Sequence, residues 1–228
     1  MKIVIGNKTY SSWSMRPWLV LKAFDLSFEE TVIPLYRDGS REAIARYSEA
    51  GKVPVLIDGD VTVWESLSII EYLAEKYPDC GIWPADRAAR AHARSASAEM
   101  HAGFSALRSA CSMTLAHRYA RKDRGAACAT DVARICALWK EARDRFGAGG
   151  PFLYGAFSAA DAMYAPVVAR FDAYQIEVPP AARAYMDAVQ SHPAYVAWRD
   201  AALRETWVLA DVGVDETVVE DFRGAGKR

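Results

Sequence analysis

The residue pattern of the chain changes near position 80, and this change limits the folds that the chain can adopt. Before it, short runs rich in β-branched residues alternate with stretches of helical periodicity, in the order strand, helix, strand, helix, strand, strand, helix. After about residue 86 almost no strand signal remains, and Ala-rich helical segments continue to about residue 203. The sequence therefore predicts a small α/β domain followed by an all-α domain.

The boundary between the two parts is marked by Pro78, Gly81 and Pro84, which interrupt regular structure. The expected parts are an α/β domain over 1–78, a linker over 79–86, an all-helical domain over 87–210 and an acidic tail over 211–228. We assign no structure to the last few residues of the tail.

Local sequence patterns predict the individual strands and helices. The expected strands cover 2–6, 28–34, 53–57 and 61–64, and the last two form a hairpin closed by a Gly-containing turn. The expected helices cover 14–24, 66–77, 87–117, 131–146, 158–174, 181–190 and 194–203. Ser14 is expected to cap the first helix. Ser158 and Asp161 have the spacing of a capping box, which we assign to stability and not to catalysis.

Charge and cysteine usage exclude several classes of protein. The chain has 28 Lys and Arg against 29 Asp and Glu, so it is not expected to bind nucleic acid by bulk charge. No stretch has the pattern of a secretory signal or of a membrane span. Four cysteines (Cys80, Cys111, Cys128 and Cys136) fit no metal or redox spacing. We therefore expect free thiols, no bound metal and a cytoplasmic location.

Short motifs along most of the chain point to one family. They are Ser11-Ser12-Trp13-Ser14-Met15-Arg16, Val53-Pro54, Glu65-Ser66, Ser158-Ala159-Ala160-Asp161 and the segment from His192 to Trp198. Together these motifs resemble those of the cytosolic glutathione S-transferases, over about residues 2–203. The resemblance implies a thioredoxin-like N-terminal domain, an all-helical C-terminal domain, a homodimer, and glutathione as the co-substrate.

Val53-Pro54 has a pattern suited to binding an extended peptide. A residue that precedes proline is extended, and it keeps its N–H and C=O available for pairing. The resemblance implies that Pro54 is cis and that the Val53 backbone pairs with the cysteinyl unit of glutathione. Lys52 is a candidate partner for the glycyl carboxylate. The alternative interpretations are an ordinary edge-strand proline and a solvated surface lysine.

Glu65-Ser66 lies where a strand ends and a helix begins. The N-terminus of a helix attracts carboxylates, and the Ser66 hydroxyl adds a donor, while Glu65 offers a negative partner for an ammonium group. These groups match the γ-glutamyl end of glutathione. The alternative is a simple helix cap in which Ser66 or Ser68 is the N-cap.

A hydroxyl near the start of the first helix is needed to stabilise the thiolate of glutathione. The Ser-Ser-x-Ser-x-Arg pattern resembles the zeta class, which implies that Ser11 is this donor; Tyr10 and Ser12 are the alternatives. Because no cysteine precedes Cys80, relatives that use a catalytic cysteine are excluded.

The first helix of the C-terminal domain supplies candidates for the second-substrate site. Arg87, Arg94, His101 and Arg108 recur every seven residues and so form one stripe, beside an apolar face that includes Phe104. We expect His101, Phe104 and Arg108 to contact the second substrate and to favour anionic electrophiles. The alternative is a solvated face or a set of ion pairs across a dimer.

The expected function is that of a serine-type glutathione transferase that conjugates or reduces small electrophiles in detoxification. One alternative is a maleylacetoacetate-type cis-trans isomerase. This alternative is disfavoured because Phe104 to Ser109 replaces the zeta pattern Ile-Gln-Pro-Leu-x-Asn. A second alternative is a non-catalytic binding protein with the same fold.

Overall fold

A computed structural model describes residues 1–209, 212–213 and 215–223. The N-terminal part contains β1 (Lys2–Ile5), α1 (Ser12–Ala23), β2 (Glu29–Val32), α2 (Ser40–Ala45), β3 (Val55–Asp58), β4 (Val61–Trp64) and α3 (Ser66–Lys76). A short 3₁₀ turn, η1 (Pro78–Cys80), leads into the rest of the chain. There follow α4 (Arg87–Ala102), α5 (Ser105–Ala110), β5 (His117–Tyr119), α6 (Ala126–Phe146), α7 (Ala159–Ala173), α8 (Pro180–Ser191), α9 (Pro193–Arg204) and β6 (Val218–Asp221).

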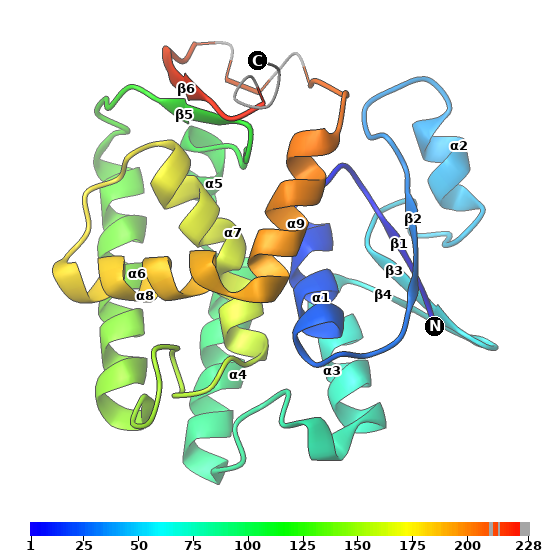
Figure 1. Ribbon diagram of the computed structural model, residues 1–228, viewed down its shortest axis with the longest axis horizontal. Helices are drawn as coiled ribbons and strands as arrows, with labels where there is room; N and C mark the ends of the chain where they lie inside the picture. The colour runs from blue at the N-terminus through cyan, green and yellow to red at the C-terminus, as the bar shows by residue number, and fades with distance from the viewer. Residues whose placement is uncertain (210–211, 214, 224–228) are drawn as a thin grey trace.

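The N-terminal elements form a four-stranded mixed sheet in the order β2-β1-β3-β4. β1 runs parallel to β2 and antiparallel to β3, so that Ile3 lies opposite Glu30 on one side and Leu56 on the other. Ile3 and Ile5 face the large core shared with α1 and α3, whereas Val4 packs with Ile44 of α2 on the opposite face. Figure 1 shows the sheet between α2 on one side and α1 and α3 on the other. The predicted α/β order is confirmed.

The C-terminal helices pack around α7, which is buried along almost its whole length. A helix that is apolar all round belongs in a core, and α7 contacts α1 of the first part as well as α4. A capping box begins it, as predicted: the carboxylate of Asp161 accepts the N–H of Ser158 at 2.8 Å, and also that of Leu153 at 3.1 Å. Burial raises the pKa of Asp161 to about 6. The two parts of the chain share one continuous apolar core.

Three predictions about helix boundaries are wrong, and one of them is the start of α6, which lies at Ala126 and not at residue 131. α1 begins at Ser12, so Ser14 lies inside the helix, where its Oγ accepts the N–H of Gly6 at 3.0 Å instead of capping. The single helix predicted over 87–117 is broken at Gly103, where any Cβ would lie 2.8 Å from the Glu99 carbonyl oxygen. Phe104 then turns with a φ of 58°. Glycine ends helices readily, and the seven-residue stripe therefore does not continue to Arg108 on one helix.

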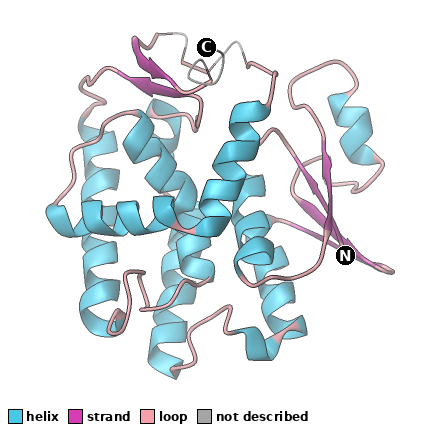
Figure 2. Ribbon diagram, viewed as in Figure 1, coloured by secondary structure: helices cyan, strands magenta, loops and turns pink. Residues whose placement is uncertain are grey.

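Two short strands were not predicted. β6, from the acidic tail, pairs antiparallel with β5, so that His117 lies opposite Asp221. Arg118 and Glu220 pair across these strands at 2.7 Å. Figure 2 shows this small second sheet apart from the main one. The region 87–210 is therefore not entirely helical, and the tail has structure. Residues 224–228, to which no structure was assigned, lie outside the described residues.

Candidate active site

Two adjoining cavities lie between the sheet and the C-terminal helices. The larger, of about 670 Å³, is lined by the start of α1, the loop that follows β2, the Gly51–Val53 segment, and residues of the helical part that include Arg108 and Arg170. The smaller, of about 250 Å³, shares Trp13, Lys52 and Val53 with the larger and adds Pro54, Glu65 and His101. The structure therefore brings most of the predicted site residues together.

Val53 precedes a cis peptide bond to Pro54, as the resemblance implied. Its backbone N–H and C=O form no hydrogen bond within the described residues, because β3 begins only at Val55. Val53 lines both cavities, and its exposed neighbour Lys52 does so too. An extended peptide lying in the cavities could therefore pair with the Val53 backbone.

Glu65 and Ser66 lie at the start of α3; Glu65 lines the smaller cavity, whereas the adjacent Ser66 is buried and lines neither cavity. Glu65 is the N-cap, with a φ of 69°, which is uncommon for a residue with a side chain. No side chain among the described residues caps this helix, and its N-cap is neither Ser66 nor Ser68, so the simple-cap interpretation of the motif is wrong. Ser66 is 1% exposed, and its Oγ has no hydrogen-bond partner among the described residues. A buried hydroxyl without a partner beside an uncapped helix N-terminus fits the binding of a carboxylate.

The three hydroxyl groups predicted as thiol donors all line the larger cavity. Ser11 is the N-cap of α1, and its Oγ lies 2.8 Å from the Oγ of Ser14. The Ser12 hydroxyl accepts a hydrogen bond from the Arg170 guanidinium at 3.4 Å. The ring of Tyr10 lies 5.8 Å from the Arg223 guanidinium. Serine and tyrosine hydroxyls can each donate to a thiolate, and the N-terminus of α1 adds a partial positive charge.

Two arginines pack against Trp13, and a third lies near them. The guanidinium groups of Arg16 and Arg108 lie 4.3 Å and 4.5 Å from the Trp13 ring centroid. Arg16 is buried and donates from Nε to the Met163 carbonyl at 3.0 Å. Arg170, on α7, donates to the Cys111 carbonyl and to Ser12. None of these three arginines pairs with a carboxylate of the described residues.

This positive charge is reflected in the ionisation of the arginines. Burial, and then the charges of Arg170 and Arg108, lowers the pKa of Arg16 to about 9. Burial, and then the charge of Arg108, lowers the pKa of Arg170 to about 10. Both groups remain protonated at neutral pH, so the group is an uncompensated cluster of cations. An anion in the larger cavity would neutralise part of it.

The predicted second-substrate residues are only partly brought to the site. His101 packs edge-on against Trp13 at 5.1 Å, and its Nε2 lies 3.8 Å from Glu65. Burial is the main cause that lowers the pKa of His101. Arg108 bends back to donate to the carbonyl groups of His101 and Gly103, at 3.3 Å and 3.0 Å. Phe104 is 7% exposed and lines neither cavity, so its assignment to the second-substrate site is not supported.

Arg170 and Trp13 are among the site residues that were not predicted from the sequence. Arg170 had a visible signal, because an arginine inside the apolar run of α7 needs a buried partner. Trp13 lies within the serine motif itself and lines both cavities. Among the described residues, no group of three or more side chains could hold a metal ion. Over the same residues, no helix is long and apolar enough to cross a bilayer.

The curated relatives align with part of the chain. A probable maleylacetoacetate isomerase from Caenorhabditis elegans is 38% identical over 97 residues, which are 42% of this chain and 44% of that protein. A dichloromethane dehalogenase from Methylophilus leisingeri is 39% identical over 61 residues, 26% of this chain and 23% of that protein. Human glutathione S-transferase theta-1 is 34% identical over 103 residues, 44% of this chain and 42% of that protein. These alignments span less than half the length of the relatives.

Solved structures match nearly the whole fold. A zeta-class maleyl pyruvate isomerase superposes with a TM-score of 0.67 at 21% identity, covering 91% of this chain and 100% of that one. A glutathione transferase homologue from Burkholderia, solved with bound glutathione, has a TM-score of 0.67 at 24% identity, covering 88% and 97%. At this identity the likeness shows the fold. The family models for the glutathione S-transferase N-terminal and C-terminal domains match residues 10–76 and 88–201, and the chain therefore belongs to the glutathione S-transferase family.

Proposed function

We propose that this protein is a serine-type glutathione transferase that activates the glutathione thiol for attack on a small electrophile. The observation that carries the proposal is the buried, unpartnered Ser66 hydroxyl at the open N-terminus of α3. It is adjacent to Glu65, which lines the smaller cavity, and the two adjoining cavities also hold the unpaired backbone of Val53 and the Ser11 hydroxyl. A tripeptide thiol with a carboxylate at each end has the chemistry that this arrangement recognises.

Each part of glutathione has a proposed partner. Ser66 and the N–H groups of α3 bind the γ-glutamyl carboxylate, and Glu65 pairs with the ammonium group. The Val53 backbone pairs with the cysteinyl unit. Lys52, which is exposed at the shared wall of the two cavities, binds the glycyl carboxylate. This order places the cysteinyl sulfur toward the start of α1.

The proposed role of Ser11 is to stabilise the thiolate. A free thiol has a pKa of about 8.5, so little thiolate exists at neutral pH without help. One hydrogen bond to a charged group contributes roughly 1.5–3 kcal/mol, which lowers the thiol pKa by about one to two units. In this proposal the domain over residues 1–78 binds glutathione, and the domain over residues 87–210 binds the electrophile.

The second substrate is proposed to be anionic. Five cations line the larger cavity (Arg37, Arg41, Lys52, Arg108 and Arg170), and no Asp or Glu of the described residues lines it. Such a cavity raises the local concentration of anions and binds them directly. Detoxifying conjugation of electrophiles that carry a carboxylate is the reaction that fits best.

Cis-trans isomerisation of a maleyl-type acid is the second candidate. Relatives from Caenorhabditis elegans and Vibrio cholerae carry the name probable maleylacetoacetate isomerase. The cations that line the larger cavity would bind a dicarboxylic acid as readily as they would bind an anionic electrophile for conjugation. The sequence from Phe104 to Ser109 still departs from the zeta pattern, so conjugation remains the leading proposal.

The assembly is proposed to be a homodimer, which acts in the cytoplasm. On β4, Trp64 and Val61 are 52% and 45% exposed, beside a hollow that Leu67, Tyr72 and His101 help to line. A large exposed apolar side chain next to a hollow is typical of a self-association surface. Sedimentation of the wild type and of Trp64→Glu tests this assignment, because only the wild type is expected to form dimers.

The proposed function is tested by retention on immobilised glutathione, followed by turnover assays. The assays pair glutathione with aryl halides, epoxides, peroxides and maleyl acids, each in an anionic and a neutral form where both exist. Retention, elution by free glutathione and turnover of an anionic electrophile support a transferase. Conversion of the maleyl acid without consumption of glutathione supports the isomerase. Retention on immobilised glutathione without turnover of any substrate would support the alternative of a non-catalytic binding protein.

A further inference from the structure

The loop between β1 and α1, residues 6–11, carries Ser11, the proposed thiol donor, and Tyr10, one of its alternatives. Lys8 and Thr9, in the middle of this loop, are 5% and 0% exposed. A buried loop needs partners for its backbone polar groups, and here the C-terminal helix α9 supplies them. Figure 1 shows α9 beside α1, the helix that the loop leads into.

Two backbone N–H groups of the loop are held by one carboxylate. The loop turns so that the N–H groups of Tyr10 and Ser11 donate to the Asn7 carbonyl, at 3.2 Å and 2.8 Å. The turn leaves the N–H groups of Lys8 and Thr9 without a backbone acceptor among the described residues. Lys8 donates to Oε1 of Glu205 at 2.6 Å, and Thr9 donates to Oε2 at 3.0 Å. Each oxygen of the carboxylate therefore accepts one charge-assisted hydrogen bond.

Further contacts fix the loop to the same helix. Glu205 is the C-cap residue of α9. The Thr9 hydroxyl lies 2.9 Å from Oε2 of Glu205 and 3.0 Å from the Ala202 carbonyl oxygen. The indole N–H of Trp198 donates to the Lys8 carbonyl at 3.0 Å, and the Lys8 ammonium lies 5.6 Å from the Trp198 ring centroid. The position of the loop is thus set by α9 as well as by the strand and helix that it joins.

The position of the Ser11 hydroxyl depends on this loop. Ser11 follows Thr9 by two residues, and its N–H closes the turn on the Asn7 carbonyl. A serine hydroxyl is one rotatable bond from the backbone, so a shift of the turn moves it directly. A displacement of about 1 Å at a reacting group can lower a rate by about a hundred-fold. The contacts of Glu205 can therefore control how well Ser11 donates into the larger cavity, which it lines.

We propose that Glu205 is a positioning residue for activation of the glutathione thiol, and that it acts by holding the β1–α1 loop so that Ser11 faces the sulfur. This inference rests on the proposed function. The negative charge of Glu205 by itself has the opposite effect, because a nearby anion destabilises a thiolate. Loss of the positioning contacts should therefore raise the pKa of the bound thiol, whereas loss of a purely electrostatic effect would lower it.

The test is the pKa of the bound glutathione thiol in Glu205→Ala. It is expected to rise by about half a unit to one unit. At pH values below the thiol pKa, kcat should fall by about three- to ten-fold, and the loss should disappear at a pH above the pKa in both proteins, where the thiol is fully ionised. Glutathione affinity should change little, since Ser66, Val53 and Lys52 are untouched.

Glu205→Gln is the conservative variant. Its amide keeps one acceptor oxygen for one of the two N–H groups, so the expected pKa rise is smaller than in Glu205→Ala. Because glutamine is nearly isosteric with glutamate, this variant carries the comparison if Glu205→Ala does not fold. Thermal unfolding of both variants measures the structural part of the effect separately.

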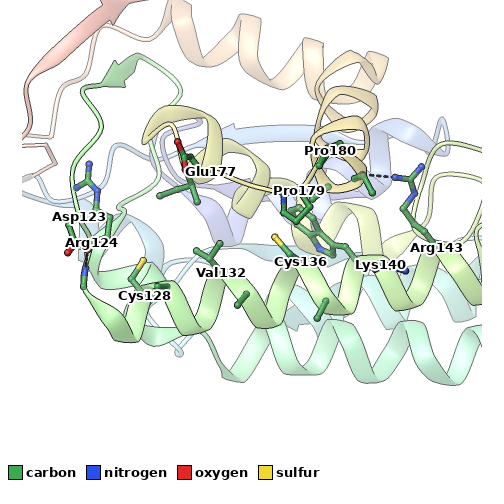
Figure 3. A pocket seen from close by; sticks show the side chains of 18 of the residues that line it. Asp123, Arg124, Cys128, Val132, Cys136, Lys140, Arg143, Glu177, Pro179 and Pro180 are labelled. Carbon is green, nitrogen blue, oxygen red and sulfur yellow. Dashed lines mark hydrogen bonds between the residues drawn. The ribbon is translucent and has the colours of Figure 1, made fainter.

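Two other glutamates of the helical part provide matched controls. Glu216 pairs with Lys122 and Arg124, each at 2.9 Å, and so anchors the C-terminal segment without a hydrogen bond to the loop. Glu177 lies beside the groove between α6 and the segment that leads into α8, which Figure 3 shows, and no residue of the N-terminal part lines that groove. Glu216→Ala and Glu177→Ala are both expected to leave the thiol pKa and kcat unchanged.

A double variant shows whether Glu205 acts through Ser11. Ser11→Ala combined with Glu205→Ala should give the same thiol pKa as Ser11→Ala alone. A further rise in the double variant, or a fall of the pKa in Glu205→Ala, would overturn the proposal. Binding and turnover of glutathione with an unchanged thiol pKa in Glu205→Ala would overturn it while leaving the proposed function intact. No glutathione binding by the wild type would overturn the proposed function and this inference together.

Discussion

The hydroxyl oxygens of Ser11 and Ser14 lie 2.8 Å apart at the first turn of α1. Ser14 is buried and already accepts the backbone N–H of Gly6 at 3.0 Å. The Ser11 hydroxyl donates to the Ser14 oxygen in this pair; because both hydroxyl groups can rotate, an acceptor in the larger cavity can take the Ser11 hydrogen while Ser14 donates to Ser11 in turn. Ser11 is then free to donate its hydrogen into the larger cavity, which it lines. The pair can therefore act as a relay in which Ser14 orients the proposed thiol donor.

Ser11→Ala is expected to raise the pKa of the bound glutathione thiol by about one to two units and to leave glutathione affinity nearly unchanged. Ser14→Ala is expected to shift the same pKa in the same direction but by less, because Ser11 can still donate. The pKa is measured from the ultraviolet absorbance of the thiolate as a function of pH. Tyr10→Phe and Ser12→Ala serve as controls. A larger shift in either control than in Ser11→Ala would move the role to that residue.

Much of the site could be predicted because its motifs are local. Val53-Pro54 and Glu65-Ser66 each act through the backbone of a few neighbouring residues, so both motifs can be found in the sequence, while the cis bond at Pro54 was implied by the resemblance to the family. Arg170 could not be placed in this way, because its contact with Ser12 joins residues 158 positions apart. The pairing of β5 with β6 is equally non-local. The helix break at Gly103 involves only neighbouring residues. It was not predicted because the helical periodicity of the sequence continues on both sides of it.

Ser66→Ala is expected to weaken glutathione binding by roughly 1.5–3 kcal/mol, because a hydrogen bond to a carboxylate is lost. The variant should be no less stable than the wild type without ligand, since the Ser66 hydroxyl has no partner in the described chain. Titration calorimetry and thermal unfolding measure the two effects. Ser68→Ala, at an exposed position of the same helix, is the control. Unchanged affinity together with lost stability would show that Ser66 only supports the fold.

Asp161 gives the protein an unusual pH dependence of stability. Its pKa is raised from 3.8 to about 6 by burial, so between these values the folded state binds more protons than the unfolded state. The proton bound to Asp161 therefore stabilises the folded state at low pH. This contribution to the free energy of unfolding is lost as pH rises through 6. Relative to Asp161→Asn, the wild type should lose about 2–3 kcal/mol of unfolding free energy between pH 4 and pH 7. Urea denaturation at each pH measures the difference, and a difference that grows with pH would contradict the assignment.

Arg108 is expected to favour anionic electrophiles, because it lines the larger cavity among four other cations and no described carboxylate. Arg108→Gln should lower kcat/KM for an anionic electrophile by about ten-fold and change it little for a neutral one of the same shape. The difference between the two substrates in their loss of kcat/KM should become smaller as ionic strength rises, since salt screens the attraction between Arg108 and the anion. Arg87→Gln, at an exposed position on α4, is the matched control. An equal loss with both electrophiles would instead assign Arg108 to structure, through its bonds to the carbonyl groups of His101 and Gly103 at the end of α4.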